Sequence, residues 1–168
     1  VGRVRETGGR HAELLLPDIG ELLAEAGLDR ADVDAVGVTL GPGGFTSVRV
    51  GLAPAKGLCL AQGRLLYATS SLRALAFGAL SGSEPVDGGV AVVTRAYRGE
   101  VYAALYTRDG GGVRELLGPF HGAPAAAAEQ LALAGAEAGL GRLSLLGDGA
   151  ALGPEAFTDA RHFEALPA

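Results

Sequence analysis

Residues 35–62 read AVGVTLGPGGFTSVRVGLAPAKGLCLAQ, and this stretch decides the fold class. Its first part, 35–40, is a short apolar run typical of a buried strand. The glycine-rich loop GPGGF at 41–45 follows directly, and Thr46 or Ser47 is expected to cap a helix over the rest of the stretch. A strand, a tight loop and a helix in this order are typical of an α/β protein.

The flanking sequence predicts further strands and helices, separated by turn residues such as the Asp-Gly-Gly-Gly run at 109–112. The expected strands span 1–6, 64–69, 89–96, 100–107, 113–117 and 143–146, and the expected helices span 12–26, 70–80 and 124–139. The polar connection at 81–88 places a domain boundary there, so that a first domain covers 1–88 and a second covers 89–168. We expect an α/β fold whose second half begins with antiparallel strands.

Both long helices of the first half have more apolar surface than one sheet can cover. In the helix over 12–26 the apolar arc spans roughly 160°, while Asp18, Glu21 and Glu25 share a narrow polar face. Pro17 should kink this helix or mark its first turn. The helix after the glycine-rich loop is apolar almost all round, which predicts that it is covered on more than one side.

Composition excludes several classes of protein. The chain has 168 residues, of which 48% are hydrophobic and 20% charged, as is usual for a globular protein. Cys59 is the only cysteine, so no internal disulfide can form. No apolar run approaches the roughly 18 residues of a membrane span, and a cytoplasmic protein with no membrane partner is expected. The net charge of −5 argues against a stand-alone nucleic-acid binder.

The glycine-rich loop has two interpretations. The first turn of a helix presents unpaired N–H groups and glycines let a phosphate or carboxylate approach closely, so Gly41, Gly43, Gly44 and Thr46 could hold an anion. The alternative is a tight turn followed by a helix cap. The loop is not a Walker A motif, because no Gly-Lys-Ser/Thr ends it, and Thr46 stands where a G-x-G-x-x-G motif needs its third glycine.

The sequence displays no set of residues for catalysis or for a metal. Thr7 stands four residues before His11, so no H-x-x-x-H pair exists there, and neither His121 nor His162 has the spacing of a metal ligand. We therefore expect no metal site and no catalytic residue, with a capping or polar-packing role for His11. Cys59 lies on an apolar stripe, which favours packing over a role as nucleophile.

Residues near the predicted strand ends also favour structural roles. Ser70 and Ser71 lie outside any G-x-S-x-G elbow, so helix capping is the better interpretation. The Gly-Asp-Gly run at 147–149 either approaches a ligand at the end of a strand or forms a plain turn. Arg95 and Arg98, around the predicted hairpin, are either a solvated tip or partner contacts.

The stretch GPGGFTSVRVGLAPAKGLCLAQG at 41–63, followed by ATSSLRALA, resembles the TsaB (YeaZ) family, whose hallmark is close to G-P-G-S-F-T-G-x-R-x-G followed by A-x-A-K-G-L and an S-S-L element. Three further matches occur in the family's order: His11-Ala12-Glu13, Arg98-Gly99-Glu100-Val101-Tyr102 and Gly147-Asp148-Gly149-Ala150. The chain departs from the family's pattern at four positions: Gly44 stands for Ser, Ser47 for Gly and Arg95 for Asp, and Pro54 interrupts the helix.

The resemblance implies an ASKHA (actin/Hsp70/sugar-kinase-like, ribonuclease-H-like) fold of two small subdomains. Members of the family are longer at both ends and open with an Asp-Thr-Ser/Ala element. This sequence has neither that element nor a methionine. We therefore expect that the first strands are missing and that the second subdomain is truncated at its C-terminus.

The resemblance also implies a function without chemistry of its own. The chain would bind and support TsaD, which carries the metal and transfers threonylcarbamoyl to the tRNA adenosine next to the anticodon. The ATPase TsaE would join the pair, and tRNA would be met only through the complex. No cofactor is expected to be required, and ATP or ADP at the partner interface is left open.

TsaB-like proteins pair through helices of the first subdomain, and a homodimer, expected when the chain is alone, uses much the same surface as the pairing with TsaD. The expected interface residues are His11, Leu15, Ile19, Leu22, Val48, Arg49, Leu52, Ala55 and Lys56. The alternative functions are an independent ASKHA-class enzyme, either a small-molecule kinase or an M22-type glycoprotease-like peptidase, and a plain dimerisation module.

Overall fold

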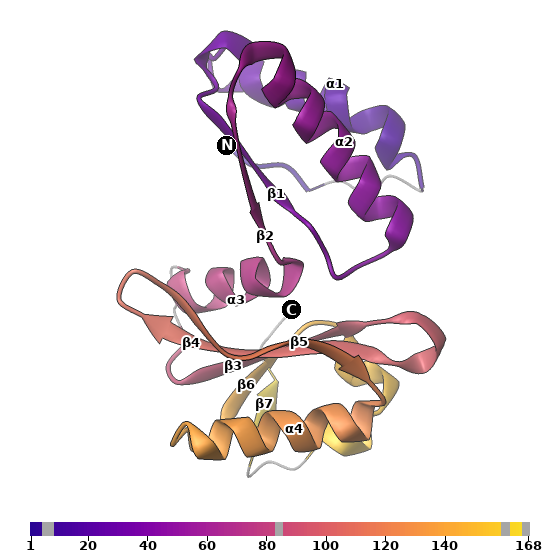
Figure 1. The fold of residues 1–168 in the computed structure, drawn as a ribbon, viewed down its shortest axis with the longest axis vertical. Helices are drawn as coiled ribbons and strands as arrows, with labels where there is room; N and C mark the ends of the chain where they lie inside the picture. The colour runs from indigo at the N-terminus through magenta and orange to yellow at the C-terminus, as the bar shows by residue number, and fades with distance from the viewer. Residues whose placement is uncertain (5–8, 83–85, 159–161, 166–168) are drawn as a thin grey trace. The chain divides into compact units, whose positions relative to one another are not determined.

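The computed structural model describes residues 1–4, 9–82, 86–158 and 162–165. The chain forms two compact units, and each consists of two segments of the sequence. The first unit consists of Val1–Leu40 and Gly44–Thr69, and the second consists of Gly41–Gly43 and Ser70–Ala168. Figure 1 labels the helices and strands and colours them along the chain.

The first unit is built around a parallel β-α-β motif. Strand β1 (Ala35–Thr39) pairs with β2 (Leu65–Thr69), and helix α2 (Phe45–Gln62) connects them. Parallel strands need such a connection, because the chain must return to the same end of the sheet before the second strand begins. Helix α1 (His11–Glu25) contacts α2, and a short 3-10 turn (Arg30–Asp32) leads into β1.

Both helices of this unit differ in detail from the sequence prediction. Helix α2 begins at Phe45 with Gly44 as its N-cap, so the expected cap by Thr46 or Ser47 is wrong. The backbone N–H of Val48 donates to the carbonyl of Gly44 at 3.0 Å, which places both hydroxyl residues inside the first turn. Helix α1 begins six residues before Pro17, so this proline does not mark its first turn.

The second unit contains a five-stranded sheet with the order β5-β4-β3-β6-β7. Its strands are β3 (Gly89–Arg95), β4 (Val101–Asp109), β5 (Gly112–Gly122), β6 (Leu143–Leu146) and β7 (Phe163–Ala165). The first three form the antiparallel meander that the turn residues predict, and β6 and β7 add in parallel on the other side of β3. The remaining elements are α3 (Ser71–Ser81), α4 (Pro124–Glu137) and the 3-10 turns Tyr97–Gly99, Gly149–Leu152 and Pro154–Phe157.

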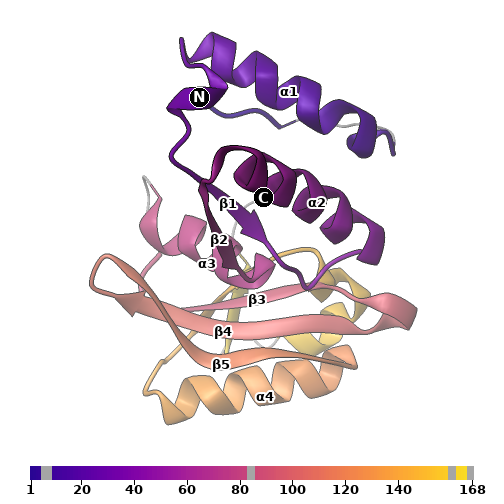
Figure 2. The same cartoon turned by 45° about the horizontal axis from the view of Figure 1, so that its top comes forward.

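The core of the second unit lies on both faces of this sheet. Val90 and Val92 of β3 pack with Leu72 of α3, whereas Ala91 on the opposite face belongs to the cluster that contains Leu131 of α4. Figures 1 and 2 show α3 and α4 covering opposite faces of the strands. A strand covered on both faces is apolar at every position rather than at alternate ones, which explains the unbroken run GVAVV in β3.

The two units divide at Thr69 and Ser70, whereas the sequence places a boundary at residue 88. The difference concerns helix α3. The polar connection at 81–88 follows α3 in the sequence, so the sequence prediction assigned this helix to the first domain. In the structure, Leu72, Ala76 and Leu80 of α3 are fully buried against the sheet of the second unit. Tertiary packing therefore assigns α3 to the second unit.

Among the described residues, no helix combines the length and the apolar character that crossing a membrane requires.

Candidate functional site

The four candidate anion-binding residues fall in both units. Gly41 has a φ of 96°, which favours glycine, and its carbonyl accepts a hydrogen bond from the backbone N–H of Ser71 at 2.8 Å. Gly43 belongs with Gly41 to the second unit, whereas Gly44 and Thr46 form the start of α2 in the first unit. The first turn of α2 contains no acidic residue, so its N–H groups and dipole remain suited to an anion. Anion binding at this loop stays a prediction.

A cation also lies at the start of α2. The guanidinium carbon of Arg49 stands 3.8 Å from the centroid of the Phe45 ring, which is the geometry of a cation–π contact. Both side chains are exposed, Phe45 to 69%. The start of the helix therefore combines positive charge with an exposed apolar ring.

The expected interface residues of α1 lie on one side of the helix. His11, Leu15, Ile19 and Leu22 are all half-buried. They line a hollow of about 190 Å³ together with Arg3 and neighbouring residues of α1. The structure thus brings these four side chains together around one hollow, which Arg3 also lines.

The expected interface residues of α2 do not share one exposed face. Ala55 is buried, and Val48 and Leu52 are half-buried, because this side of α2 packs against β1 and α1. Arg49 and Lys56 are exposed, as a partner interface requires. The exposed side of the helix carries a different set of residues, here called the α2 stripe: Phe45, Arg49, Ala53, Lys56 and Leu60.

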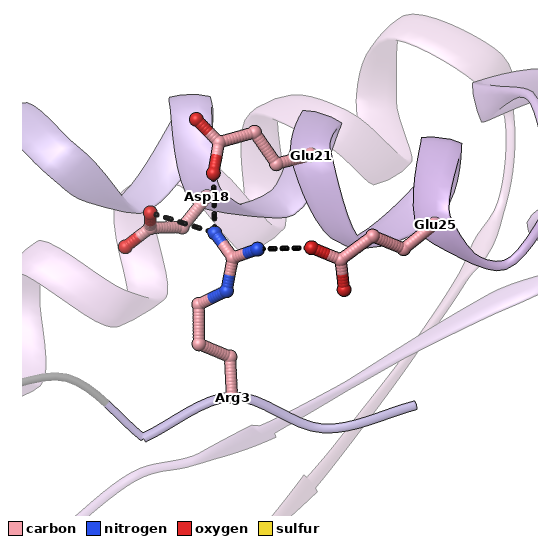
Figure 3. A network of polar contacts seen from close by, with 4 residues as sticks. All are labelled: Arg3, Asp18, Glu21 and Glu25. Atoms are coloured by element: carbon pink, nitrogen blue, oxygen red, sulfur yellow. Dashed lines mark hydrogen bonds and ion pairs between the residues drawn. The ribbon is translucent and has the colours of Figure 1, made fainter.

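The polar face of α1 is occupied by an arginine of the same chain. The guanidinium of Arg3 binds Asp18, Glu21 and Glu25, as Figure 3 shows, with 3.4 Å between Nη1 and the Asp18 carboxylate. Its hydrogen bond to Glu21 is the largest contribution that raises the pKa of Arg3 above its ordinary value. The spacing that predicts a shared polar face of Asp18, Glu21 and Glu25 is confirmed, but nothing in the sequence pointed to Arg3 as their partner.

A second cavity, of about 350 Å³, lies between α1, β1 and α2. Ile19, Val36 and Leu58 are among its mostly apolar lining residues. Arg64 also lines it, and the Nε atom of Arg64 is buried without a hydrogen-bond partner, although its Nη2 donates to the carbonyl of Ala31 at 2.6 Å. Periodicity could not find this cavity, because three separate elements form its walls.

The three histidines lie in different parts of the described chain. In the described part of the chain, no three side chains of His, Cys, Asp or Glu come together as metal ligands. His11 is the first residue of α1, where Arg10 is the N-cap, and Thr7 lies outside the described residues. His121 stands 3.3 Å from the Glu100 carboxylate at the surface of the second unit.

The Gly-Asp-Gly loop after β6 packs against the backbone of β3. The side chain of Asp148 accepts a hydrogen bond from the N–H of Arg95 at 3.1 Å and also faces its guanidinium. A Cβ at Gly147 would lie 2.3 Å from the carbonyl oxygen of Val93, and one at Gly149 would meet the backbone of Thr94. These glycines serve close packing, so the structure favours the plain turn over a ligand loop.

The serine pair before α3 has the expected capping role. The Ser70 hydroxyl accepts a hydrogen bond from the N–H of Arg73 at 2.9 Å, which makes Ser70 the N-cap. The same hydroxyl lies 3.4 Å from the hydroxyl of Tyr106, a fully buried side chain. Burial raises the pKa of Tyr106 above its ordinary value.

Cys59 of α2 is also buried, and its Sγ lies 3.4 Å from the carbonyl oxygen of Leu65.

Comparison with protein families gives one match over most of the chain. Residues 5–157 match the family model described as "TsaD: tRNA N6-adenosine threonylcarbamoyltransferase".

Curated relatives match shorter segments. A protein of Escherichia coli (strain K12), "tRNA threonylcarbamoyladenosine biosynthesis protein TsaB", is 34% identical over 103 residues, which is 61% of this chain and 44% of the relative. An uncharacterized protein of Mycobacterium tuberculosis is 42% identical over 104 residues, 62% of this chain and 46% of the relative. A "tRNA N6-adenosine threonylcarbamoyltransferase" of Erythrobacter litoralis is 46% identical over 72 residues, 42% of this chain and 21% of the relative. The chain thus spans less than half the length of the curated relatives it matches.

Two solved structures from Pseudomonas aeruginosa are similar to this one. The crystal structure of an uncharacterized protein "with similarity to peptidase YEAZ" has a TM-score of 0.74 at 30% identity, and the match covers 94% of this chain and 68% of the other. A structure of YeaZ has a TM-score of 0.63 at 35% identity, and the match covers 68% of this chain and 53% of the other.

Proposed function

This chain belongs to the family that the TsaD model describes, in which it is homologous to TsaB and YeaZ, and we propose that it is a TsaB-like subunit that binds and supports a TsaD-like protein. Its mixed α/β architecture is consistent with the ASKHA-like fold. The pair would serve threonylcarbamoylation of the tRNA adenosine next to the anticodon. The observation that carries the proposal is the match to TsaB and YeaZ in both sequence and structure.

The proposed contact with the TsaD-like protein lies on the first unit. Its helices expose apolar side chains beyond those that its small sheet covers, such as Leu16 at 45% and Leu60 at 84%. Arg49 and Lys56 of the expected interface are also exposed there. Large apolar side chains left at the surface next to charged ones are typical of a binding surface.

The other components follow from the same proposal. A TsaE-like ATPase joins the complex in the cytoplasm. This chain contacts tRNA only as part of that complex. If ATP or ADP binds this chain, the start of α2 at Gly44 and Thr46 offers N–H groups without a competing carboxylate in the first turn. No residue of this chain is assigned a catalytic role.

Reconstitution tests the proposal. TsaC-, TsaD- and TsaE-like proteins are combined with tRNA, ATP, threonine and bicarbonate, with and without this chain, and threonylcarbamoyladenosine is measured by mass spectrometry of the digested tRNA. The modification should depend on this chain. The same yield in its absence would refute the supporting role.

The alternative is an independent enzyme, and one of the two similar structures is described as resembling a peptidase. The purified chain alone distinguishes the two functions. Under the proposal it neither hydrolyses ATP nor cleaves peptides, whereas either activity, lost in a variant of a single polar residue, would favour a kinase-like or peptidase-like enzyme.

A further inference from the structure

We propose that the apex of the β3–β4 hairpin in the second unit contacts one nucleotide of the substrate tRNA, with a base stacked on the Tyr97 ring and a phosphate bound by the Arg98 guanidinium. This inference rests on the proposed function, which supplies the tRNA, and it names a contact that this chain itself makes within the complex. The apex is the turn Tyr97–Gly99, which joins β3 to β4 at one end of the sheet (Figure 1).

The turn holds Arg98 in a backbone conformation that is unusual for its residue type. Arg98 has φ 58° and ψ 33°, Gly99 has φ 80°, and the N–H of Glu100 donates to the carbonyl of Tyr97 at 3.3 Å. Positive φ at both central positions is typical of a type I′ turn, in which Asn-Gly is favoured. Within the described ranges, Arg98 is the only non-glycine residue with positive φ. Because asparagine or glycine would fit the turn with less strain, the outlier points to a role for the arginine side chain.

The apex presents an accessible aromatic ring beside a cation. Tyr97 is 79% exposed, and the guanidinium carbon of Arg98 lies 5.4 Å from the centroid of its ring. Unstacked bases of single-stranded RNA stack on tyrosine rings, and arginine binds phosphate oxygens through its planar set of N–H donors. The two side chains therefore match the two parts of a nucleotide, the base and the phosphate.

The carboxylates near the apex are engaged by other side chains. Asp148 accepts a hydrogen bond from the N–H of Arg95 and faces its guanidinium at 3.6 Å, and Glu100 lies 3.3 Å from Nδ1 of His121. In the part of the chain that the structure describes, no ion pair involves Arg98. Its charge is therefore available for a phosphate.

The size of the apex favours a nucleotide over a protein partner. A stable protein interface buries about 800 Å² on each partner and centres on packed anchor residues. Within the segment 95–100, Tyr97 is the only large hydrophobic residue, and the others are charged or small. One ring and one cation are enough for a nucleotide, because stacking needs a single flat face. Since the chain has a net charge of −5, this contact adds to tRNA binding by the complex.

Steady-state kinetics of the reconstituted modification, with tRNA varied, tests the inference. Arg98→Asn removes the cation and suits the turn, so this variant should unfold in urea at no lower midpoint than the wild type. It should nevertheless raise KM for tRNA about fivefold or more, with kcat unchanged. The slope of log KM against log salt should fall by about 0.7, as expected when one phosphate contact to a single strand is lost.

The ring is tested separately from the charge. Tyr97→Ala should raise KM for tRNA about fivefold or more, whereas Tyr97→Phe keeps the ring and should behave like the wild type. The matched control is Arg108→Asn, which makes the same change of charge on an exposed residue at the β4–β5 hairpin of the same sheet. This control should leave KM for tRNA unchanged.

The outcomes separate this inference from the function on which it rests. If modification depends on the chain but neither Arg98→Asn nor Tyr97→Ala changes KM for tRNA, the inference is overturned and the proposed function stands. A rise in KM for ATP alone would assign the apex to a free nucleotide, and weaker calorimetric binding of the TsaD-like protein without RNA would assign it to a protein contact. Either result overturns the tRNA contact. If modification does not depend on this chain, the proposed function and the inference fall together.

Discussion

The substitution Gly149→Ala tests how tightly the Gly-Asp-Gly loop packs in the second unit. An added Cβ would lie 2.7 Å from the carbonyl carbon of Thr94 and 2.9 Å from its N and O atoms. Non-bonded carbon atoms normally stay about 3.5 to 4.0 Å apart. All three contacts are to backbone, so no side chain can rotate away and the loop must separate from β3.

The expected loss of stability follows from two contributions. Forcing an extra methyl group into a packed site costs about 1 to 3 kcal/mol. Moving the loop also disturbs the hydrogen bond from the N–H of Arg95 to Asp148, and such a bond contributes about 1 kcal/mol. We therefore expect Gly149→Ala to lower the free energy of unfolding by about 2 to 4 kcal/mol.

Urea unfolding followed by far-UV circular dichroism measures this loss. The matched control is Gly111→Ala, because Gly111 is exposed, has no atom within 4 Å of an added Cβ and lies in the same unit. The control should change the free energy of unfolding by less than about 0.5 kcal/mol. Equal midpoints for the two variants would refute the close packing of the loop and reopen its interpretation as a ligand site.

Two further predictions concern the start of α3 and the residue beside it. Ser70→Ala removes the N-cap of α3 and should cost about 1 kcal/mol in urea unfolding, whereas Ser81→Ala at the exposed end of the same helix should cost almost nothing. A cost at Ser70 no larger than at Ser81 would contradict the capping role. Because burial raises the pKa of Tyr106, the unfolded chain loses this proton first, so stability is full below about pH 10 and falls as the pH rises through the folded-state pKa. Unfolding between about pH 9 and pH 11 should be less pH-dependent in Tyr106→Phe, and an identical profile in both proteins would exclude this contribution.

Much of the fold could be predicted from local pattern. Strand β6 occupies the predicted residues, and the hairpin of β3 and β4 forms where the turn residues Tyr97-Arg98-Gly99 indicated. These elements are predictable because a short apolar run and the turn-forming residues beside it act over a few positions of the sequence. The length of β5 was underestimated. The prediction ended at residue 117, because the C-terminal part of the strand, GPFHG at 118–122, lacks an apolar run.

The candidate site was less predictable. The sequence analysis expected Val48, Leu52 and Ala55 of α2 at the partner interface, whereas in the structure these residues are half-buried or buried within the first unit. The side that stays exposed holds Phe45 and Leu60, which a sequence pattern would place in a core. A helix that is apolar almost all round does not indicate which side is buried. The elements that pack against it determine which side is buried and which stays exposed.

The sequence by itself determined the order and kind of the elements, the family and the glycine-rich connection between β1 and α2, because these depend on residues adjacent in the chain. Only the tertiary structure decided that α3 belongs to the second unit, that Arg3 pairs with the acidic face of α1, and that Arg49 and Lys56 stay exposed on the same helix as Phe45 and Leu60. The physical reason is that burial and ion pairing depend on which distant segments come together, and periodicity along one helix carries no information about its partner.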